Sequence, residues 1–203
     1  GIPQAVLDDT LVLPPNDIDI VAKRLADDDI ACLLIEPTGA GFCSIPCPEA
    51  FVHQIREVTA RHGVILLFDE VVTGFRVSPG GAQAHYGIMP DLTSLAKILA
   101  GGLPGGALCG RADIMDLISI KLENETKAGQ KMPHPGTFNA NPWSASSRLA
   151  TLNIAATGGP QRKAAESADR LIDGFNELID RNELDWAVYG AFSGFDIHIA
   201  HGL

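Results

Sequence analysis

The sequence has 203 residues, of which 46% are hydrophobic and 20% charged, and this composition is typical of a globular domain rather than a disordered chain. The net charge of −10 argues against nucleic acid or an anionic membrane surface as a partner. No apolar run approaches the ~18 residues of a membrane-spanning helix, and no basic and then apolar leader opens the chain. We therefore expect neither a nucleic-acid nor a membrane partner.

Four cysteines lie in apolar or loop contexts: Cys32, Cys43, Cys47 and Cys109. Cys43 and Cys47 lack a second pair or suitably spaced histidines, so we expect no metal site there. His198 and His201 are three residues apart on a presumed strand and would point to opposite faces, which also disfavours a metal pair. The cysteines are thus expected to be reduced, in a cytoplasmic protein.

At the amino-terminal end, the pattern predicts short strands followed by a helix. Residues 5–7 and 10–13 are short runs typical of β-structure. Asn16 is the expected cap of a helix whose apolar residues recur at helical spacing. Residues 30–35 then predict a buried strand.

The middle of the chain alternates between helices and strands. Pro48 and Gly63 bound a predicted helix with its apolar positions on one side. Residues 64–68 predict a strand buried on both faces, and residues 92–96 predict another. This alternation implies parallel pairing through right-handed crossovers. Residues 106–109 follow too soon for a helical crossover, so their strand is expected to be antiparallel to its predecessor.

The second half of the chain is predicted to be mainly helical. The expected elements are a short helix at 80–86, a helix at 112–118, a polar mobile loop at 123–136, a helix at 141–156 capped by Asn141, and a half-exposed strand at 195–199. The best boundary in the chain is formed by Gly158, Gly159 and Pro160, after which a long helix with one apolar face is predicted. The fold class is therefore α/β, with a mostly parallel sheet and helices on both faces.

Charged side chains follow two of the predicted strands. Asp69 and Glu70 close the first apolar run, and Lys97 closes the second. In open α/β sheets, ligands collect at the carboxyl ends of the strands. An amine there can form a Schiff base with an aldehyde cofactor, and a carboxylate can keep a pyridine nitrogen protonated.

The surroundings of the lysine support a role for it. Lys97 stands between Ala96 and Ile98 inside an apolar run, so we expect it to be desolvated and nucleophilic. Residues 101–106 form a loop almost without side chains, which is expected to leave room beside the amine.

Three segments resemble the signatures of the class III aminotransferases, which are pyridoxal phosphate enzymes of the aspartate aminotransferase fold, fold type I. They are DEVVTGFR at 69–76, PDLTSLAKILAGGLPGGALCGR at 90–111 and HPGTFNANP at 134–142. Within that class they look most like the glutamate-1-semialdehyde aminomutase branch. The resemblance implies that residues 1–157 are part of the cofactor-binding large domain and that residues 158–203 begin a small α+β carboxyl-terminal domain. It also implies that this chain covers only the middle of such an enzyme.

The resemblance assigns roles to four residues. Lys97 would hold pyridoxal 5'-phosphate as a Schiff base and act as general acid–base, and Asp69 would pair with the pyridine nitrogen. Val71 would pack against one face of the ring. Thr137 would donate its hydroxyl and backbone N–H to the cofactor phosphate of a neighbouring subunit, which implies a homodimer with a shared active site.

Other positions are less informative or depart from the family pattern. Val72 stands where many class III members have a glutamine, and Gly41 stands where other branches carry a glutamate, which fits the aminomutase-like branch. Glu70 could brace the loop or a neighbouring helix. Arg76 could either meet a substrate carboxylate or brace its loop.

The predicted function is amino-group transfer between a small amino donor and an oxo acceptor, by transamination or by an intramolecular aminomutase reaction. The alternative is a truncated remnant of the fold that binds no cofactor, because the resemblance places the phosphate loop outside the chain. The presence of Lys97, Asp69 and Thr137 argues against a remnant. A Rossmann-type nucleotide binder is disfavoured because no GxGxxG follows a strand into a helix.

Overall fold

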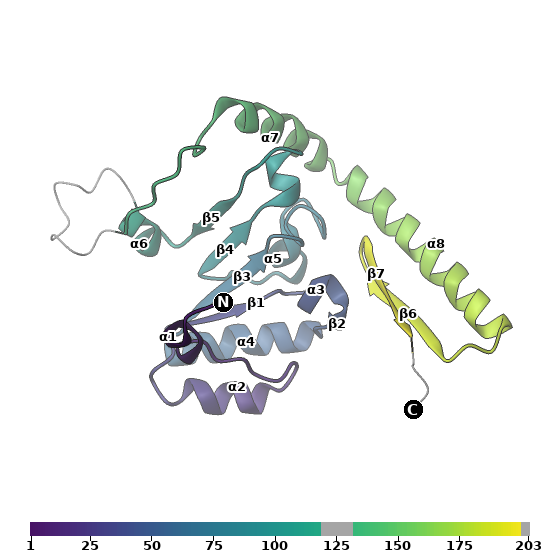
Figure 1. Cartoon of the computed structure of the whole chain (residues 1–203), viewed down its shortest axis with the longest axis horizontal. Helices are drawn as coiled ribbons and strands as arrows, with labels where there is room; N and C mark the ends of the chain where they lie inside the picture. Colours follow the sequence, from purple (N-terminus) through teal and green to yellow (C-terminus); the bar gives the residue numbers. More distant parts are fainter. Residues whose placement is uncertain (119–131, 200–203) are drawn as a thin grey trace.

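The computed structural model describes residues 1–118 and 132–199. The strands of this part are β1 Cys32–Ile35, β2 Ile45–Pro46, β3 Ile65–Glu70, β4 Leu92–Leu95, β5 Ala107–Gly110, β6 Trp186–Ala191 and β7 Gly194–Ile199. The helices are α1 Gln4–Asp8, α2 Ile18–Leu25, α3 Ala40–Cys43, α4 Glu49–His62, α5 Gly81–Tyr86, η1 Lys97–Ala100, α6 Ala112–Met115, η2 Asp116–Ile118, α7 Pro142–Ala155 and α8 Gly159–Arg181. A four-stranded sheet forms one body, and α7 and α8 lead from it to a two-stranded hairpin (Figure 1).

The four-stranded sheet has the order β1-β3-β4-β5. β3 is parallel to both β1 and β4, whereas β5 is antiparallel to β4. The predicted parallel and antiparallel pairings are thus confirmed. Ile35 pairs with Phe68, and Asp69 pairs with Ser94, so β1, β3 and β4 end at the same edge of the sheet. Ligands of open α/β folds bind at this edge.

Helix α4 forms the hydrophobic core together with β3 and α2. Its buried apolar residues are those predicted from the periodicity, namely Phe51, Val52, Ile55 and Val58. They belong to one cluster with Leu66 and Phe68 of β3 and Leu25 of α2. The helix ends at Gly63, whose φ of 69° lies in the left-handed region that favours glycine. Burying side chains such as Ile55 stabilises the fold by about 2 kcal/mol each.

The strands are less completely buried than the apolar runs suggest. In β3, fully buried residues alternate with partly buried ones, so the prediction of burial on both faces is wrong. β1 is an edge strand of the sheet, and its Leu34 is 64% exposed. The strand predicted at 30–35 is therefore present, but the prediction that it is buried is wrong. The reason is that α4 and α2 cover only one face of this part of the sheet.

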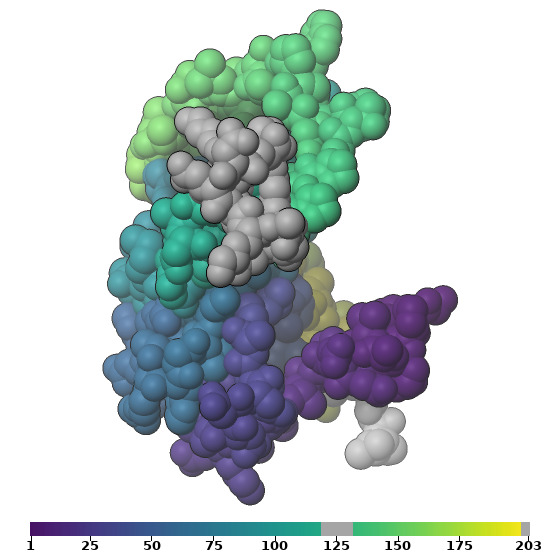
Figure 2. Space-filling model, turned by 90° about the vertical axis from the view of Figure 1, so that its left-hand side faces the viewer, coloured from purple at the N-terminus to yellow at the C-terminus, as the bar shows by residue number. Residues whose placement is uncertain are grey.

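The amino-terminal residues do not form the strands predicted at 5–7 and 10–13. Residues 4–8 form the short helix α1, and residues 10–13 have no regular structure. A short β-type run needs a partner strand to form a ladder, and neither run is paired in the described part of the chain. This segment projects from the body of the molecule (Figure 2), and it leaves several apolar side chains exposed, including Ile2, Val6, Leu11 and Val12.

The carboxyl-terminal elements agree with most of the predictions. Asn141 caps α7 by accepting a hydrogen bond from the Ser144 N–H at 2.9 Å, and Gly158 has a φ of 69° at the start of α8. β7 covers the predicted strand at 195–199 and pairs with β6. Asn176 of α8 binds both the N–H and the carbonyl of Val188, which fastens the hairpin to the helix. Most of the loop predicted at 123–136, and His201, lie outside the described residues.

Asp91, just before β4, joins three elements on the core side of the sheet. Its Oδ2 accepts hydrogen bonds from the Leu66 N–H at 2.9 Å and from Arg56 Nη1 at 2.8 Å, and its Oδ1 accepts one from Arg111 Nη1 at 3.1 Å. Burial by itself raises the pKa of the Asp91 carboxyl, but these donors outweigh burial and hold the pKa below its ordinary value of 3.8. Asp91 therefore stabilises the fold in its ionised form.

The substitution Asp91→Asn should lower the free energy of unfolding by about 2–3 kcal/mol at pH 7. A carboxyl whose pKa is depressed on folding stabilises above its unfolded pKa and loses this contribution as the pH falls through the folded pKa. The difference between wild type and variant should therefore begin to narrow as the pH falls below about 4 and continue to narrow at lower pH. Urea unfolding at pH 3 to 7 measures it, with Asp113→Asn, which loses only an exposed ion pair with Arg111, as the control. A difference that does not change with pH would contradict the proposed ionisation.

Candidate active site

Three charged residues lie at the ends of three neighbouring strands. Glu36 follows β1, Asp69 is the penultimate residue of β3, and Lys97 comes two residues after β4. The order β1-β3-β4 and the parallel pairing bring them to one edge of the sheet. The structure therefore places an acid and an amine on adjacent strand ends, with a second acid on the next strand.

In the described part of the chain, hydrogen bonds reach only one of the two carboxylate oxygens of Asp69. Its Oδ1 accepts hydrogen bonds from the Val71 N–H at 3.0 Å and from the Ser94 hydroxyl at 3.1 Å. Ser94 is the residue directly opposite on β4, so the register of the sheet provides this contact. Within the described part of the chain, no hydrogen bond reaches Oδ2. This oxygen can therefore accept a proton-bearing group of a ligand without losing a protein partner.

Lys97 stands in a strained backbone conformation. Its φ is 47°, in the left-handed region that residues with side chains rarely adopt, and it starts the 3₁₀ helix η1. The side chain is exposed, so the prediction that its apolar neighbours desolvate it is wrong for this chain. Ile98 is only partly buried, and the burial begins with Leu99 and Ala100, which turn inward as the 3₁₀ helix forms.

The glycine loop at 101–106 packs against α7 at Gly101, whereas residues 102–106 are exposed. A Cβ on Gly101, whose φ is 66°, would lie 2.6 Å from the carbonyl oxygen of Ser147 in α7. The hydroxyl of Ser147 donates to the Gly101 carbonyl, and the hydroxyl of Ser144 donates to the Pro104 carbonyl at 2.9 Å. Helix α7 thereby supports the segment that presents Lys97.

Glu36 has a carboxylate bound by its own loop. Its Oε2 accepts a hydrogen bond from the Gly41 N–H at 3.1 Å, and its Oε1 accepts one from the Phe42 N–H at 2.9 Å. Burial raises the pKa of Glu36 above its ordinary value of 4.5, although these two N–H groups act in the opposite direction. The charge of Asp69 raises this pKa further and that of Lys97 lowers it, so the three groups share one electrostatic environment.

Comparison with known proteins identifies the family. The model of the family described as Aminotransferase class-III matches residues 4–199. The chain belongs to the class-III aminotransferases. The family resemblance drawn from the three sequence segments is thus confirmed.

The relatives of this class-III chain include aminomutases and transaminases. It is 37% identical over 204 residues to a glutamate-1-semialdehyde 2,1-aminomutase from Pyrobaculum neutrophilum. It superposes on an omega-transaminase from Sphaerobacter thermophilus with a TM-score of 0.87 at 35% identity over its full length, 45% of that chain. It superposes on a glutamate-1-semialdehyde aminomutase from Pseudomonas aeruginosa in complex with PMP with a TM-score of 0.79 at 27% identity, covering 95% of this chain and 43% of that one. The chain spans about half the length of the curated relatives it matches, 46% for the Pyrobaculum neutrophilum protein.

Glu70 of this class-III chain points away from the charged edge and braces helix α5. Its fully buried carboxylate accepts hydrogen bonds from the Thr73 hydroxyl at 2.9 Å, the Ala82 N–H at 2.7 Å and the Gln83 N–H at 2.9 Å. A Cβ on Gly81 would overlap this carboxylate, so glycine is required there. The bracing role considered for Glu70 in the sequence is the one that the structure shows.

The other predicted site residues occupy different places. Val71 follows β3, is partly buried and donates its N–H to Asp69. Arg76 donates from Nε to the Val72 carbonyl at 3.2 Å, which braces its loop. Thr137 lies in the exposed turn at 137–140 before α7, so this chain does not bring it into the cluster at the strand ends.

Two members of the cluster were missed from the sequence. Glu36 follows a predicted strand, as Asp69 does, so the rule of strand ends could have found it. Ser94 lies inside an apolar run, and only the register with β3 brings it opposite Asp69.

The described residues contain no group of three or more metal-ligating side chains and no helix long and apolar enough to cross a membrane. All four cysteines are free of disulfides. Burial raises the pKa of the Cys47 thiol to about 11, and it also raises the pKa of Cys43 and Cys32.

Glu70→Ala should lower the free energy of unfolding by about 3 kcal/mol, because three buried donors lose their acceptor. The matched variant Thr73→Val removes one of these donors and should cost only about 1 kcal/mol. Denaturant unfolding of both variants measures the difference. Equal losses in the two variants would show that the α5 amides do not depend on Glu70.

Proposed function

We propose that the protein transfers amino groups with pyridoxal 5'-phosphate between a small amino donor and an oxo acceptor. The observation that carries the proposal is the pairing of Asp69 and Lys97 on adjacent strand ends in a chain of the class-III aminotransferase family. A relative solved with PMP, the amine form of this cofactor, supports the choice of cofactor.

The residues present fit this cofactor. Asp69 has one oxygen held by Ser94 and Val71, and its Oδ2 is available to the pyridine nitrogen. Lys97 offers an exposed amine on the neighbouring strand end. When bound, pyridoxal phosphate supplies an aldehyde that takes up amino groups and a ring that accepts electrons. Val71, directly beyond β3, is our candidate for the contact with the ring face.

The two charged residues would do different chemical work. Asp69 Oδ2 would keep the proton on the ring nitrogen, since an ion pair at ~4 Å contributes on the order of 4 kcal/mol at an intermediate dielectric. Lys97 Nζ would hold the cofactor through its aldehyde group. The Lys97 amine would also act as general acid–base, taking the proton from the substrate carbon that carries the nitrogen and giving it to the carbon that next carries the nitrogen. Ser94 keeps Asp69 oriented throughout.

The curated relatives favour the aminomutase form of the reaction, in which one molecule gives up an amino group and takes it back at the adjacent carbon. The first similar proteins are all glutamate-1-semialdehyde 2,1-aminomutases, at 37–40% identity. Transamination between two molecules uses the same residues. Assays with glutamate 1-semialdehyde alone and with separate donor and acceptor pairs distinguish the two reactions.

We also infer a homodimer with a shared active site, in which Thr137 would serve the cofactor phosphate of the neighbouring subunit. The segment around Thr137 carries large apolar side chains that are exposed in one chain, Phe138 at 81% and Trp143 at 82%. Leu149 and Ile154 extend this exposure along α7. Exposed aromatic groups of this kind are typical of the centres of protein interfaces.

Residues 158–203 are proposed to begin a second, smaller domain after the large domain of residues 1–157. The break in the helix at Gly158 and the separate sheet of β6 and β7 support this division. We also propose a cytoplasmic location, which the four free thiols support.

The first test is the site of cofactor attachment. The whole protein should turn yellow with pyridoxal phosphate, and borohydride reduction should leave a stable adduct that peptide mapping assigns to Lys97. Lys97→Ala should abolish this adduct, whereas Lys23→Ala, on the exposed side of α2, should leave it unchanged. Asp69→Asn should still form the adduct but turn over about a thousandfold more slowly. An adduct on another lysine, or none, would favour the remnant of the fold.

The second test is the interface. Trp143→Asp should convert the protein from dimer to monomer, because it places a charge in an apolar contact, and should weaken cofactor binding by at least about tenfold. Thr137→Ala should weaken cofactor binding to a similar degree while the dimer persists. Analytical ultracentrifugation and cofactor titration measure the two effects. A monomeric wild type with full cofactor affinity would refute the shared site.

A further inference from the structure

The loop after Glu36 contains a turn in an uncommon backbone conformation. Gly41, Phe42 and Cys43 have successive φ values of 63°, 52° and 74°, all in the left-handed region. Glycine adopts this region readily, whereas residues with a Cβ adopt it only where contacts hold them there. The contacts around residues 41–43 must therefore stabilise two strained residues in a row.

The carboxylate of Glu36 provides these contacts from inside the turn. It accepts the consecutive N–H groups of Gly41 and Phe42, one on each oxygen, at 3.1 and 2.9 Å. Consecutive N–H groups that converge on one anion form a concave binding arrangement, and the anion in turn holds the backbone in shape. An ionised acceptor makes these hydrogen bonds about twice as strong as a neutral one.

The turn at 41–43 also contacts side chains from other parts of the chain. The ring of Phe42 lies against Gly194, where a Cβ would overlap it, and the guanidinium of Arg76 lies 5.7 Å from the ring centroid. Arg76 Nη1 also donates to the Ser193 hydroxyl at 3.4 Å. The next residue of the loop, Ser44, accepts a hydrogen bond from the Tyr189 hydroxyl at 2.8 Å. The turn thus connects Glu36 to Arg76 and to the β6–β7 hairpin.

We propose that Glu36 is a positioning residue of the active site, which holds the turn at 41–43 and through Phe42 sets the place of Arg76 and of the β6–β7 turn beside the end of β3. This inference rests on the proposed amino-transfer function, because the site that it shapes is the edge that carries Asp69 and Lys97. Glu36 touches neither reacting atoms nor cofactor in this role. Removal of the Glu36 carboxylate should make the positions of Arg76 and the β6–β7 turn less fixed, and should alter the chemical step less.

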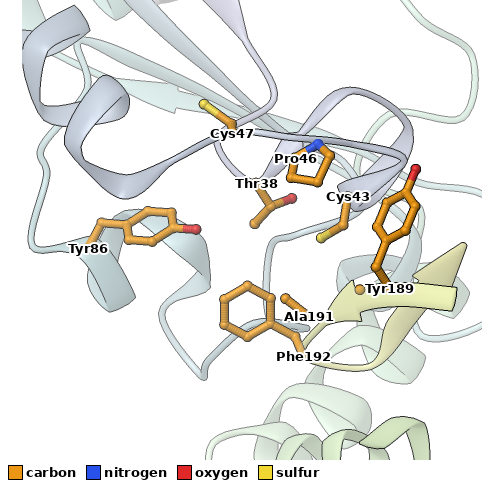
Figure 3. Close-up of a pocket in the computed structure, with 9 residues that line it drawn as sticks. Thr38, Cys43, Pro46, Cys47, Tyr86, Tyr189, Ala191 and Phe192 are labelled. Carbon is orange, nitrogen blue, oxygen red and sulfur yellow. The ribbon is translucent and has the colours of Figure 1, made fainter. Parts of the chain in front are cut away.

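Cys43 offers a direct measure of the turn. Its side chain is buried and faces a cavity of about 180 Å³, together with Ala191 and Phe192 (Figure 3). Because only 4% of Cys43 is exposed, we expect its thiol to react faster with a bulky alkylating reagent when the turn opens. Its reaction rate therefore reports the stability of the turn without any cofactor or activity.

The first experiment alkylates the cofactor-free whole protein at one pH and follows each cysteine by peptide mapping. Glu36→Gln should raise the rate at Cys43 by about tenfold, because both hydrogen bonds lose their charged acceptor. Glu36→Asp, which keeps the charge, should restore part of the protection. Cys109 on the exposed strand β5 serves as the internal standard, and Glu57→Gln on the exposed side of α4 is the matched control. An unchanged rate at Cys43 in a folded Glu36→Gln protein, checked by circular dichroism, would overturn the proposal.

The second experiment measures steady-state kinetics of the cofactor-loaded protein. Glu36→Gln should raise KM for the amino donor by about tenfold and change kcat by less than about threefold. Phe42→Leu, which keeps the acid and removes the ring under Arg76, should reproduce the rise in KM, and it decides the question if Glu36→Gln does not fold. A fall in kcat at constant KM would overturn the positioning role. If the wild type has no transferase activity, the proposed function fails, while the Cys43 rates still decide whether Glu36 holds the turn.

Discussion

The architecture depends on the way in which β3 ends in two consecutive carboxylates. Neighbouring residues of a strand point to opposite faces of a sheet, so Asp69 and Glu70 cannot serve the same environment. Glu70 is fully buried and meets the amides at the start of α5, while Asp69 is half-buried and meets Ser94 on β4. One acid therefore stabilises the fold, and the other remains available at the edge where the strands end.

Strained backbone accumulates near this same edge. Lys97 and the turn at 41–43 adopt left-handed conformations that cost free energy, and in each case nearby contacts hold them in place. Helix α7 supports the segment of Lys97 through the Gly101 contact, and Glu36 supports the turn through two N–H groups. The hydrophobic core is formed by residues of α2, α4 and β3, and no residue within these three elements has a positive φ. The hydrophobic core and the charged edge of the sheet are thus built from different residues of the same strands.

The chain also connects its two sheets through polar and aromatic contacts rather than a continuous apolar core. Arg76 reaches Ser193, Phe42 packs on Gly194, and Tyr189 donates to Ser44, each joining the loops at the strand ends to the hairpin of β6 and β7. Contacts of this kind fix the relative position of the two sheets but stabilise it only modestly, since single hydrogen bonds contribute about 1 kcal/mol each. A small shift of the hairpin would therefore move the loops at the strand ends, and a shift of these loops would move the hairpin.

The local pattern of the sequence determined the strands β3 and β4, the buried face of α4 and its end at Gly63, because periodicity and glycine chemistry act over a few residues. The three family segments likewise identified Asp69 and Lys97 as the residues of interest. Only the tertiary structure decided that Ser94 faces Asp69, that Glu36 belongs to the same edge and that Lys97 is exposed, since strand register and burial depend on distant parts of the chain. The same reason explains why residues 5–7 and 10–13 form no strands: a strand exists only where another strand pairs with it.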